Sequence, residues 1–194
     1  MFRFLAGPGV PSTLRLMDAG LSLAEWTVLA LICEHPTHGF AIAQLTTPGG
    51  ELGRVWHFSK PVVYRSIAHL EESGLVKPQA VEAGRGPQRT VYSATQAGQK
   101  VAADWLETPV QHVRDVRSQL LLKLALLHRT GTDPSGLLRR QKAVLQPIAS
   151  KIATERPSCE GFDATLLAWR WATTIATLSF LDDLTQMATA AASR

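Results

Sequence analysis

The spacing of apolar residues changes once between residues 21 and 107, and this change limits the fold more than any single motif does. Three segments with apolar residues three and four positions apart come first, which is the spacing of amphipathic helices. Two short runs with alternating apolar residues follow, and a fourth helical segment ends the stretch. The predicted order is therefore helix, helix, helix, strand, turn, strand and helix.

The first two helices are marked by their end residues. Residues 21–34 (LSLAEWTVLALICE) place Ser22 three positions before Glu25, which is the spacing of a capping box. Pro36 ends this helix, because proline cannot continue the hydrogen-bond ladder. A second helix is predicted over residues 38–46 (HGFAIAQLT), and a loop rich in glycine and proline follows it.

The third helix is predicted over residues 59–73, and it has one apolar and one polar side. Ser59 can cap it, Pro61 lies in its first turn, and Gly74 follows as the residue that ends it. The apolar stripe, for which we expect burial, contains Val63, Ile67 and Leu70. The residues on or near the opposite side are Ser59, Lys60, Tyr64, Arg65 and His69.

Two alternating runs, residues 75–81 and 89–94, predict a β-hairpin. Residues 84–88 (GRGPQ) separate them and predict a flexible turn with Arg85 at its tip. A further helix begins after Thr95, which can cap it. Three helices followed by a hairpin form the winged variant of the helix-turn-helix. We therefore expect a mostly α fold, with a minor β part in an N-terminal winged helix-turn-helix domain.

The excess positive charge of the chain lies in this predicted domain. Residues 54–100 contain seven Lys and Arg against three Asp and Glu, whereas the rest of the chain contains thirteen of each. A phosphate-binding face concentrates charge in this way. We therefore expect double-stranded DNA as a partner, with the polar side of the third helix in the major groove. Arg85 and Arg89 of the hairpin are expected to reach the flanking backbone or the minor groove.

Several of these segments resemble the PadR family of bacterial transcriptional regulators. The segments that carry the resemblance are VLALI (28–32), HGFAIAQL (38–45), VVYRSIAHLEESGLV (62–76) and GRGPQRTVYSATQAG (84–98), which ends in a Thr-x-x-Gly. Their order and spacing are similar to those of the family over residues 21–106. The resemblance implies a dimeric repressor whose C-terminal helices form the dimer. It also implies that a small aromatic or drug-like ligand often relieves the repression.

The C-terminal residues have helical spacing in three segments, 110–131, 133–157 and 161–192. The last segment is apolar on two sides, which requires burial on both. Trp169 and Trp171 are two residues apart, so they point about 200° apart around the helix axis and cannot face the same core layer. One side is expected to pack inside the subunit. The other either packs under its own neighbours as well, or contacts a second subunit of a homodimer or lines a cavity for a small aromatic effector.

Composition restricts the remaining possibilities. Hydrophobic residues make up 45% of the chain, which is enough for a core, and Cys33 and Cys159 have no near cysteine neighbour, as in a cytoplasmic protein without disulfides. Residues 164–181 include Arg170, so we expect a buried helix there rather than a membrane span. Residues 1–20 are interrupted by glycine and proline and are interpreted as a flexible arm. The expected domains are thus residues 1–20, 21–107 and 108–194.

Other classes of protein fit less well. His35 and His38 form an HxxH pair without a third ligand, and no HExxH, P-loop, GxSxG or GxGxxG motif is present, so we expect no enzyme, metal or cofactor. A MarR-like regulator usually places more dimerising helix before its DNA-binding domain, whereas here most of the extra chain follows it. A winged helix that only binds other proteins stays an alternative, and it predicts no salt-dependent affinity for DNA.

Overall fold

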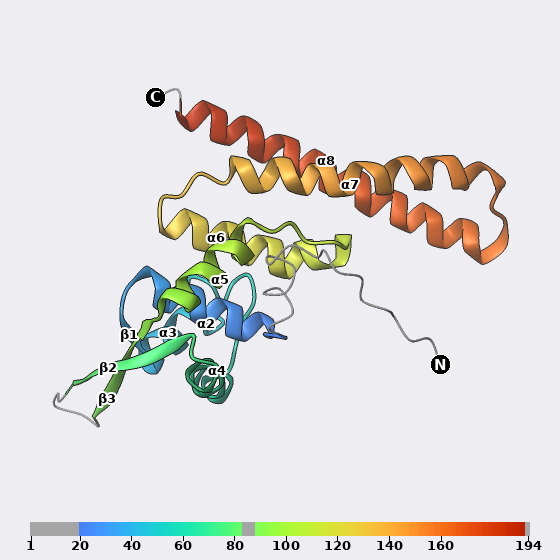
Figure 1. The fold of residues 1–194 in the computed structure, drawn as a ribbon. Coiled ribbons are helices and arrows are strands. Elements are labelled where there is room, and N and C mark those ends of the chain that lie inside the picture. Colours follow the sequence, from blue (N-terminus) through green and yellow to red (C-terminus); the bar gives the residue numbers. More distant parts are fainter. Residues whose placement is uncertain (1–19, 83–87, 193–194) are drawn as a thin grey trace, which may run out of the picture. The chain divides into compact units, whose positions relative to one another are not determined.

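The computed structural model describes residues 20–82 and 88–192, and these residues are mostly helical, as the sequence predicts (Figure 1). The chain divides into two compact units. Of the described residues, the first unit contains 20–45, 58–82 and 88–105, and the second contains 46–57 and 106–192. The predicted arm, except for Gly20, and residues 84–87 of the predicted turn lie outside the described residues.

The first unit combines helices with a small antiparallel sheet. Its elements in the described residues are α2 (Leu23–Glu34), β1 (Thr37–His38), α3 (Gly39–Thr46), α4 (Lys60–Glu72), β2 (Val76–Glu82), β3 (Arg89–Ala94) and α5 (Gln96–Glu107). The strand order is β1-β3-β2. The sequence did not predict β1, because two residues are too few to show a periodicity. This strand exists through its pairing with β3, in which Thr37 lies opposite Tyr92 and His38 opposite Val91.

The central helix of the first unit is α2, and it begins with the predicted capping box. The Glu25 backbone N–H donates to Ser22 Oγ at 3.3 Å, and the Ser22 N–H donates to Glu25 Oε2 at 2.6 Å. Nearly every residue from Ala24 to Ile32 is buried. Trp26 also stacks on Trp105 of α5, with ring centroids 5.4 Å apart. These contacts make α2 the helix around which the unit is built.

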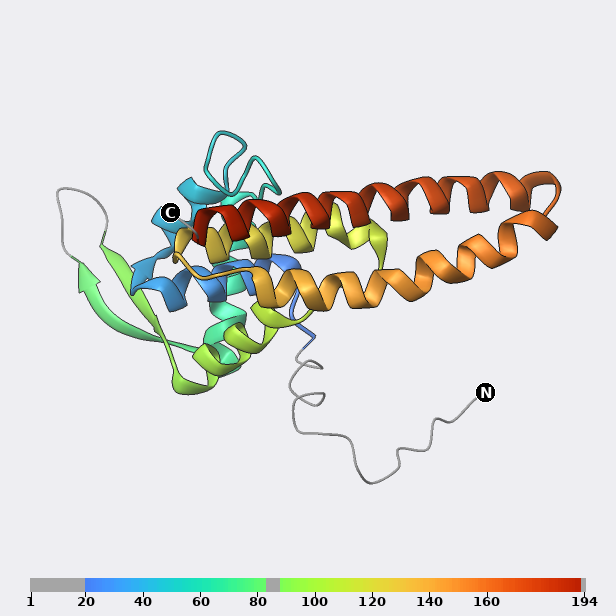
Figure 2. The ribbon, with the colours of Figure 1, turned by 90° about the horizontal axis from the view of Figure 1, so that it is seen from above.

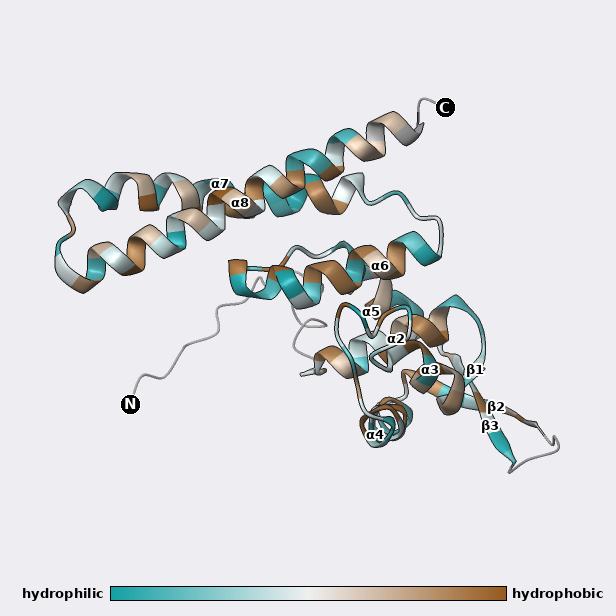
Figure 3. Cartoon of the chain, turned by 180° about the vertical axis from the view of Figure 1, so that it is seen from behind, coloured by the Kyte–Doolittle hydropathy of each residue, from teal (hydrophilic) through white to brown (hydrophobic). Residues whose placement is uncertain are grey.

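The apolar stripe of α4 is buried as predicted. Val63, Ile67 and Leu70 are at most 3% exposed, and α4 packs on α2. Figure 3 shows both hydrophobic and hydrophilic residues on α4, as an amphipathic helix requires. Ser59 is the N-cap residue, as predicted, but its hydroxyl makes no cap hydrogen bond. Its backbone carbonyl accepts from the Val63 N–H at 3.2 Å.

The Thr-x-x-Gly at the start of α5 ties this helix to the end of α4. The Thr95 hydroxyl donates to the Gly74 carbonyl at 2.8 Å and accepts from the Gly98 N–H at 3.1 Å. A Cβ atom on Gly98 would lie 2.0 Å from the Leu75 carbonyl oxygen. Only glycine therefore lets the first turn of α5 approach the backbone between α4 and β2 this closely.

The second unit is helical apart from its loops. Its helices in the described residues are a 3₁₀-helix (Val113–Asp115), a π-helix (Val116–Leu120), α6 (Leu121–Arg129), α7 (Ser135–Glu155), a second 3₁₀-helix (Arg156–Ser158) and α8 (Gly161–Ala192). The segment predicted as one helix over residues 110–131 thus changes its winding before α6. The helix α7 begins at Ser135, one residue later than predicted. The predicted cap Asp133 accepts from the Ser135 N–H at 3.0 Å. Figure 2 shows α7 and α8, in orange and red, running side by side.

The two apolar sides of α8 differ in burial. One side contributes Leu167 and Leu181 to the interior, at 7% and 0% exposure. The other side carries Trp169, which is 68% exposed in the single chain. Within residues 20–82 and 88–192, no helix is both long and apolar enough to span a membrane.

Candidate nucleic-acid interface

The polar residues predicted to contact DNA lie together on the exposed side of α4. Ser59, at the start of the helix, is exposed, and so are the side chains of Lys60, Tyr64, Arg65 and His69. Arg65 and His69 are four residues apart and so share a face of the helix away from the buried stripe, whereas Ser59, Lys60 and Tyr64 lie exposed beside the first turns. Two cations, two hydroxyls and an imidazole can thus reach one partner at the same time.

His69 is also bound within its own unit. Its Nδ1 lies 2.6 Å from Glu25 Oε1, so Nε2 is the ring atom that could reach DNA. Burial acts to raise the pKa of Glu25, but hydrogen bonds from Ser22 and the attraction of His69 outweigh it and lower that pKa below its ordinary value. The Glu25 carboxylate therefore joins the start of α2 to the last turns of α4.

The cations predicted on two different elements meet at Phe40 of α3. The Arg89 guanidinium lies 4.5 Å from the centroid of the Phe40 ring, and the Lys60 ammonium lies 5.4 Å from it. Lys60 is also 6.0 Å from the Tyr64 ring centroid. No role for Phe40 in DNA binding was predicted from the sequence. The sequence does show an aromatic residue beside Gly39, which could have suggested such a role, but it does not show which cations lie over the ring.

Arg85, at the tip of the predicted wing, lies outside the described residues, so its role stays a prediction. Arg89 is exposed at the start of β3, at the base of the same hairpin. Its Nη1 lies 3.5 Å from His38 Nε2. The structure therefore brings six of the seven predicted residues into one unit, five of them on or at the start of α4.

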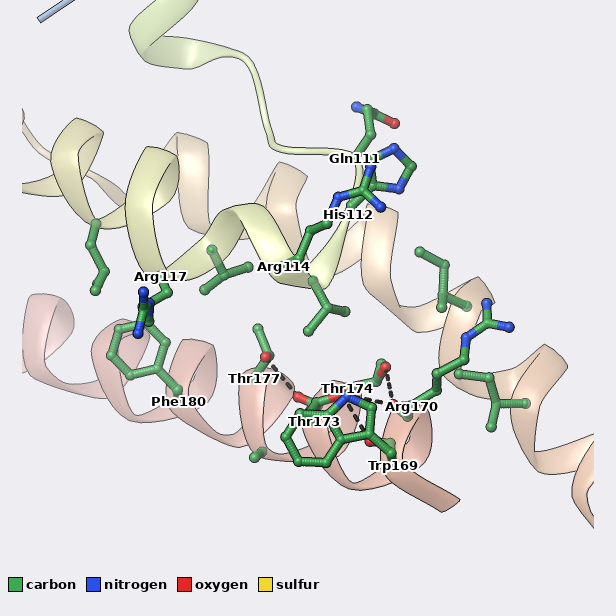
Figure 4. A pocket seen from close by; sticks show the side chains of 16 residues that line it. Gln111, His112, Arg114, Arg117, Trp169, Arg170, Thr173, Thr174, Thr177 and Phe180 are labelled. Carbon is green, nitrogen blue, oxygen red and sulfur yellow. Dashed lines mark hydrogen bonds between the residues drawn. The ribbon is translucent and has the colours of Figure 1, made fainter. Parts of the chain in front are cut away.

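The second unit contains a pocket of about 770 Å³. Its lining residues come from the segment before α6 and from α6, α7 and α8; they are Gln111, His112, Val113, Arg114, Val116, Arg117, Leu121, Ile148, Ile152, Trp169, Arg170, Thr173, Thr174, Ala176, Thr177 and Phe180. Figure 4 shows Trp169 and Phe180 on one side of the pocket and arginines on both. None of these lining residues is acidic.

The two tryptophans of α8 lie in different surroundings, as their spacing predicted. Trp169 lines the pocket, whereas Trp171 does not. The Trp171 ring instead lies 5.2 Å from the guanidinium of Arg156. Of the two candidate pocket residues, only Trp169 is therefore placed to contact a ligand there.

The described part of the first unit has three helices, α2, α3 and α4, followed by a β-hairpin, and α4 carries exposed cations. This arrangement, with the strand order β1-β3-β2, defines a winged helix-turn-helix protein. Residues 28–104 match the model of the transcriptional regulator PadR-like family. This match lies within the winged-helix unit, so residues 28–104 are similar to that family.

The structure is also similar to solved structures, all at low sequence identity. Bacillus subtilis PadR in complex with operator DNA is 17% identical, with 86% of this chain and 98% of that chain covered and a TM-score of 0.44. Smu.1604c from Streptococcus mutans UA159 is 14% identical, with 82% and 96% covered and a TM-score of 0.39. A further structure of Bacillus subtilis PadR is 16% identical, with 86% and 95% covered and a TM-score of 0.38. No curated protein matches the sequence.

Proposed function

We propose that this protein is a sequence-specific DNA-binding repressor that acts as a homodimer on a palindromic operator. The observation that carries the proposal is the exposed polar side of α4, where Lys60 and Arg65 project from a helix whose other side is buried. One α-helix fits the major groove, and a two-fold dimer places two such helices on the two halves of a palindrome.

The proposed contact residues have distinct roles in this scheme. Arg65, in the second turn, is the best placed to read a guanine edge, because its guanidinium can form two parallel hydrogen bonds. Lys60 and the hydroxyls of Ser59 and Tyr64 contact phosphates and fix the helix in the groove. Arg89, with Arg85 of the wing, contacts the flanking backbone.

The dimer is supported by the apolar surface that α8 leaves uncovered. Phe162, Trp169 and Met187 are 77%, 68% and 67% exposed, and Leu166 and Ile175 are 43% and 39% exposed. Large apolar side chains spread along one long helix are typical of a surface that another subunit covers. A second copy of this chain is the occupant that the proposed palindromic operator requires.

An effector ligand is supported by the pocket that contains Trp169. The ring of Trp169 offers a stacking surface, and Arg114, Arg117 and Arg170 also line the pocket, which has no acidic lining residue. This lining favours a small aromatic molecule with a negative charge. In the proposed mechanism, binding such a ligand changes the distance between the α4 helices of the two subunits. Because the DNA fixes the spacing of the two half-sites, the altered dimer no longer fits and releases the operator.

The test begins with selection of a bound sequence from random duplexes. Fluorescence anisotropy with this duplex then compares the wild type with the Lys60→Ala/Arg65→Ala variant at several salt concentrations. A charge-matched control, Lys100→Ala/Arg139→Ala, removes two exposed cations elsewhere. If Arg65 reads a base, its single replacement costs about 1–3 kcal/mol for the selected site, whereas a phosphate contact weakens all duplexes alike and lowers the salt slope by about one. Unchanged binding by the double variant would refute the proposal.

Sedimentation tests the dimer separately. Full-length protein is expected to sediment as a dimer at micromolar concentration, and truncation at Gly161 is expected to give a monomer or an aggregate with weak operator affinity. A monomeric full-length protein would contradict the dimer. If this chain binds other proteins but shows no salt-dependent affinity for any duplex, the result would favour the alternative of a winged helix that only binds other proteins.

A further inference from the structure

The tripeptide His38-Gly39-Phe40, at the start of α3, lies between β3 and α4 in the first unit. His38 pairs with Val91 of β3 in the sheet. The ring of Tyr64 lies so close to Gly39 that a Cβ atom there would be 2.9 Å from Tyr64 Cε1. The tripeptide therefore contacts both elements from which DNA contacts are expected.

Phe40 holds one cation from each of these elements. Arg89 of β3 and Lys60 of α4 lie 4.5 and 5.4 Å from the centroid of its ring, within the range of a cation–π interaction. Because both cations lie within 5.4 Å of the same ring centroid, they are close enough to contact the backbone of one DNA strand. The ring thus fixes the relative positions of cations that are far apart in sequence.

His38 brings a third hydrogen-bond donor to the same place. Its Nδ1 accepts from the Ala41 backbone N–H at 3.0 Å, and an amide N–H can only donate. A neutral imidazole that accepts at Nδ1 carries its proton on Nε2. That Nε2 lies 3.5 Å from Arg89 Nη1, which is also a donor. Two facing donors cannot satisfy each other, whereas an anionic oxygen between them accepts from both.

We propose that His38, Lys60 and Arg89 form a binding site for a phosphate group beside Phe40, and that the DNA backbone supplies this phosphate. The proposal rests on the DNA binding proposed above and adds His38 and Phe40 to it. His38 donates from Nε2, and the two cations neutralise the phosphate. Phe40 is a positioning residue, which acts through Lys60 and Arg89 rather than on the DNA itself.

Replacements of Phe40 test the positioning role in the full-length protein. Phe40→Leu keeps an apolar side chain without an aromatic ring, whereas Phe40→Tyr keeps the ring. Phe40→Leu is expected to weaken binding of the selected duplex by about fivefold at low salt, because cation–π contacts are lost. The salt slope falls by about one, as for a lost phosphate contact, and the preferred sequence stays the same. Phe40→Tyr keeps the wild-type slope. A purely structural role would lower the melting temperature without changing the slope.

His38→Asn tests the donor. The Asn side-chain oxygen can still cap α3, but no donor remains at the position of Nε2. The expected result is weaker binding with a lower salt slope and an unchanged helix content by circular dichroism. If Phe40→Leu and His38→Asn keep wild-type affinity and slope while Lys60→Ala/Arg65→Ala loses binding, the phosphate site is refuted and the DNA-binding function stands.

A titration with inorganic phosphate covers the case in which the wild type binds no duplex. The ring nitrogen signals of His38 are followed by NMR in the full-length protein. A saturable shift that Phe40→Leu abolishes would show a site for free phosphate and would refute DNA as its source. No shift, together with no DNA binding, would refute the site altogether.

Discussion

Replacing Gly39 with alanine should separate DNA affinity from stability. The added Cβ would lie 2.9 Å from Tyr64 Cε1 and 3.0 Å from Ile67 Cδ1. Tyr64 is 46% exposed, so its ring can swing into solvent, whereas Ile67 is 3% exposed and can move only slightly. We therefore expect Gly39→Ala to displace the Tyr64 ring from its position on α4 and to leave the fold intact.

The expected free-energy changes follow from these contacts. Crowding of a packed side chain costs about 1–3 kcal/mol, and the lower end applies because one of the two neighbours can move away. Replacement of glycine in a compatible conformation returns about 0.4–1 kcal/mol. The net loss should be about 1 kcal/mol, or a fall of about 2–4 °C in melting temperature for a chain of this size. A lost hydrogen bond from the Tyr64 hydroxyl to a phosphate is worth about 1.5–3 kcal/mol, so DNA affinity should fall at least about tenfold.

The assays are thermal unfolding by circular dichroism, the chemical shifts of the Tyr64 ring, and anisotropy with the selected duplex. Gly49→Ala is the control, because a Cβ atom at Gly49 would have no heavy atom within 4 Å. Displaced Tyr64 signals combined with wild-type affinity would show that Tyr64 does not contact DNA. A fall of more than about 10 °C would show that the ring cannot move and that the geometric reasoning is wrong.

Three further predictions concern other parts of the chain. Gly98→Ala should destabilise the protein by about 3 kcal/mol or more in thermal unfolding, because its Cβ would lie 2.0 Å from a backbone oxygen. The control Gly136→Ala should be nearly neutral in the same assay, because only a flexible arginine side chain lies near it. Burial lowers the pKa of Lys123 from 10.5 to about 7, so between these pH values the unfolded chain binds more protons than the folded one. The free energy of unfolding should therefore rise with pH across this window. Urea titrations of Lys123→Met should show a smaller rise. Arg85→Ala should weaken DNA binding more at low salt than at high salt and leave the preferred sequence intact; a changed preference with the same overall affinity would show that the wing reads bases.

Features set by neighbouring residues were predictable from the sequence. The capping box of α2 needs only Ser22 and Glu25, three residues apart, and the buried stripe of α4 needs only its own spacing. The beginning and end of β3 were also predicted correctly, because an alternating run bounded by turn residues is a local signal. In each of these cases the energy that selects the conformation comes from residues within one or two turns.

Features that depend on distant residues were not predictable. The strand β1 is defined by its partner β3, and the contact of His69 with Glu25 joins residues from two different helices. The 3₁₀ and π turns before α6 were also missed, because periodicity alone does not distinguish them from an α-helix. The sequence showed that Trp169 and Trp171 differ in direction, but only the packing of α7 and α8 shows that Trp169 lines the pocket.

The contacts of α4 within the first unit explain how one exposed helix could bind DNA tightly. Near its end, His69 is held by Glu25 of α2, and at its start Lys60 lies over Phe40 of α3. Side chains that are already ordered lose less conformational entropy when they meet a partner, by about 0.5–1.5 kcal/mol for each long side chain. Arg65, for which no such contact is found in the described residues, lies between these two fixed points. In the proposed complex with DNA, the anchored residues would hold the helix at a constant depth on the backbone, and Arg65 would select the base that it meets there.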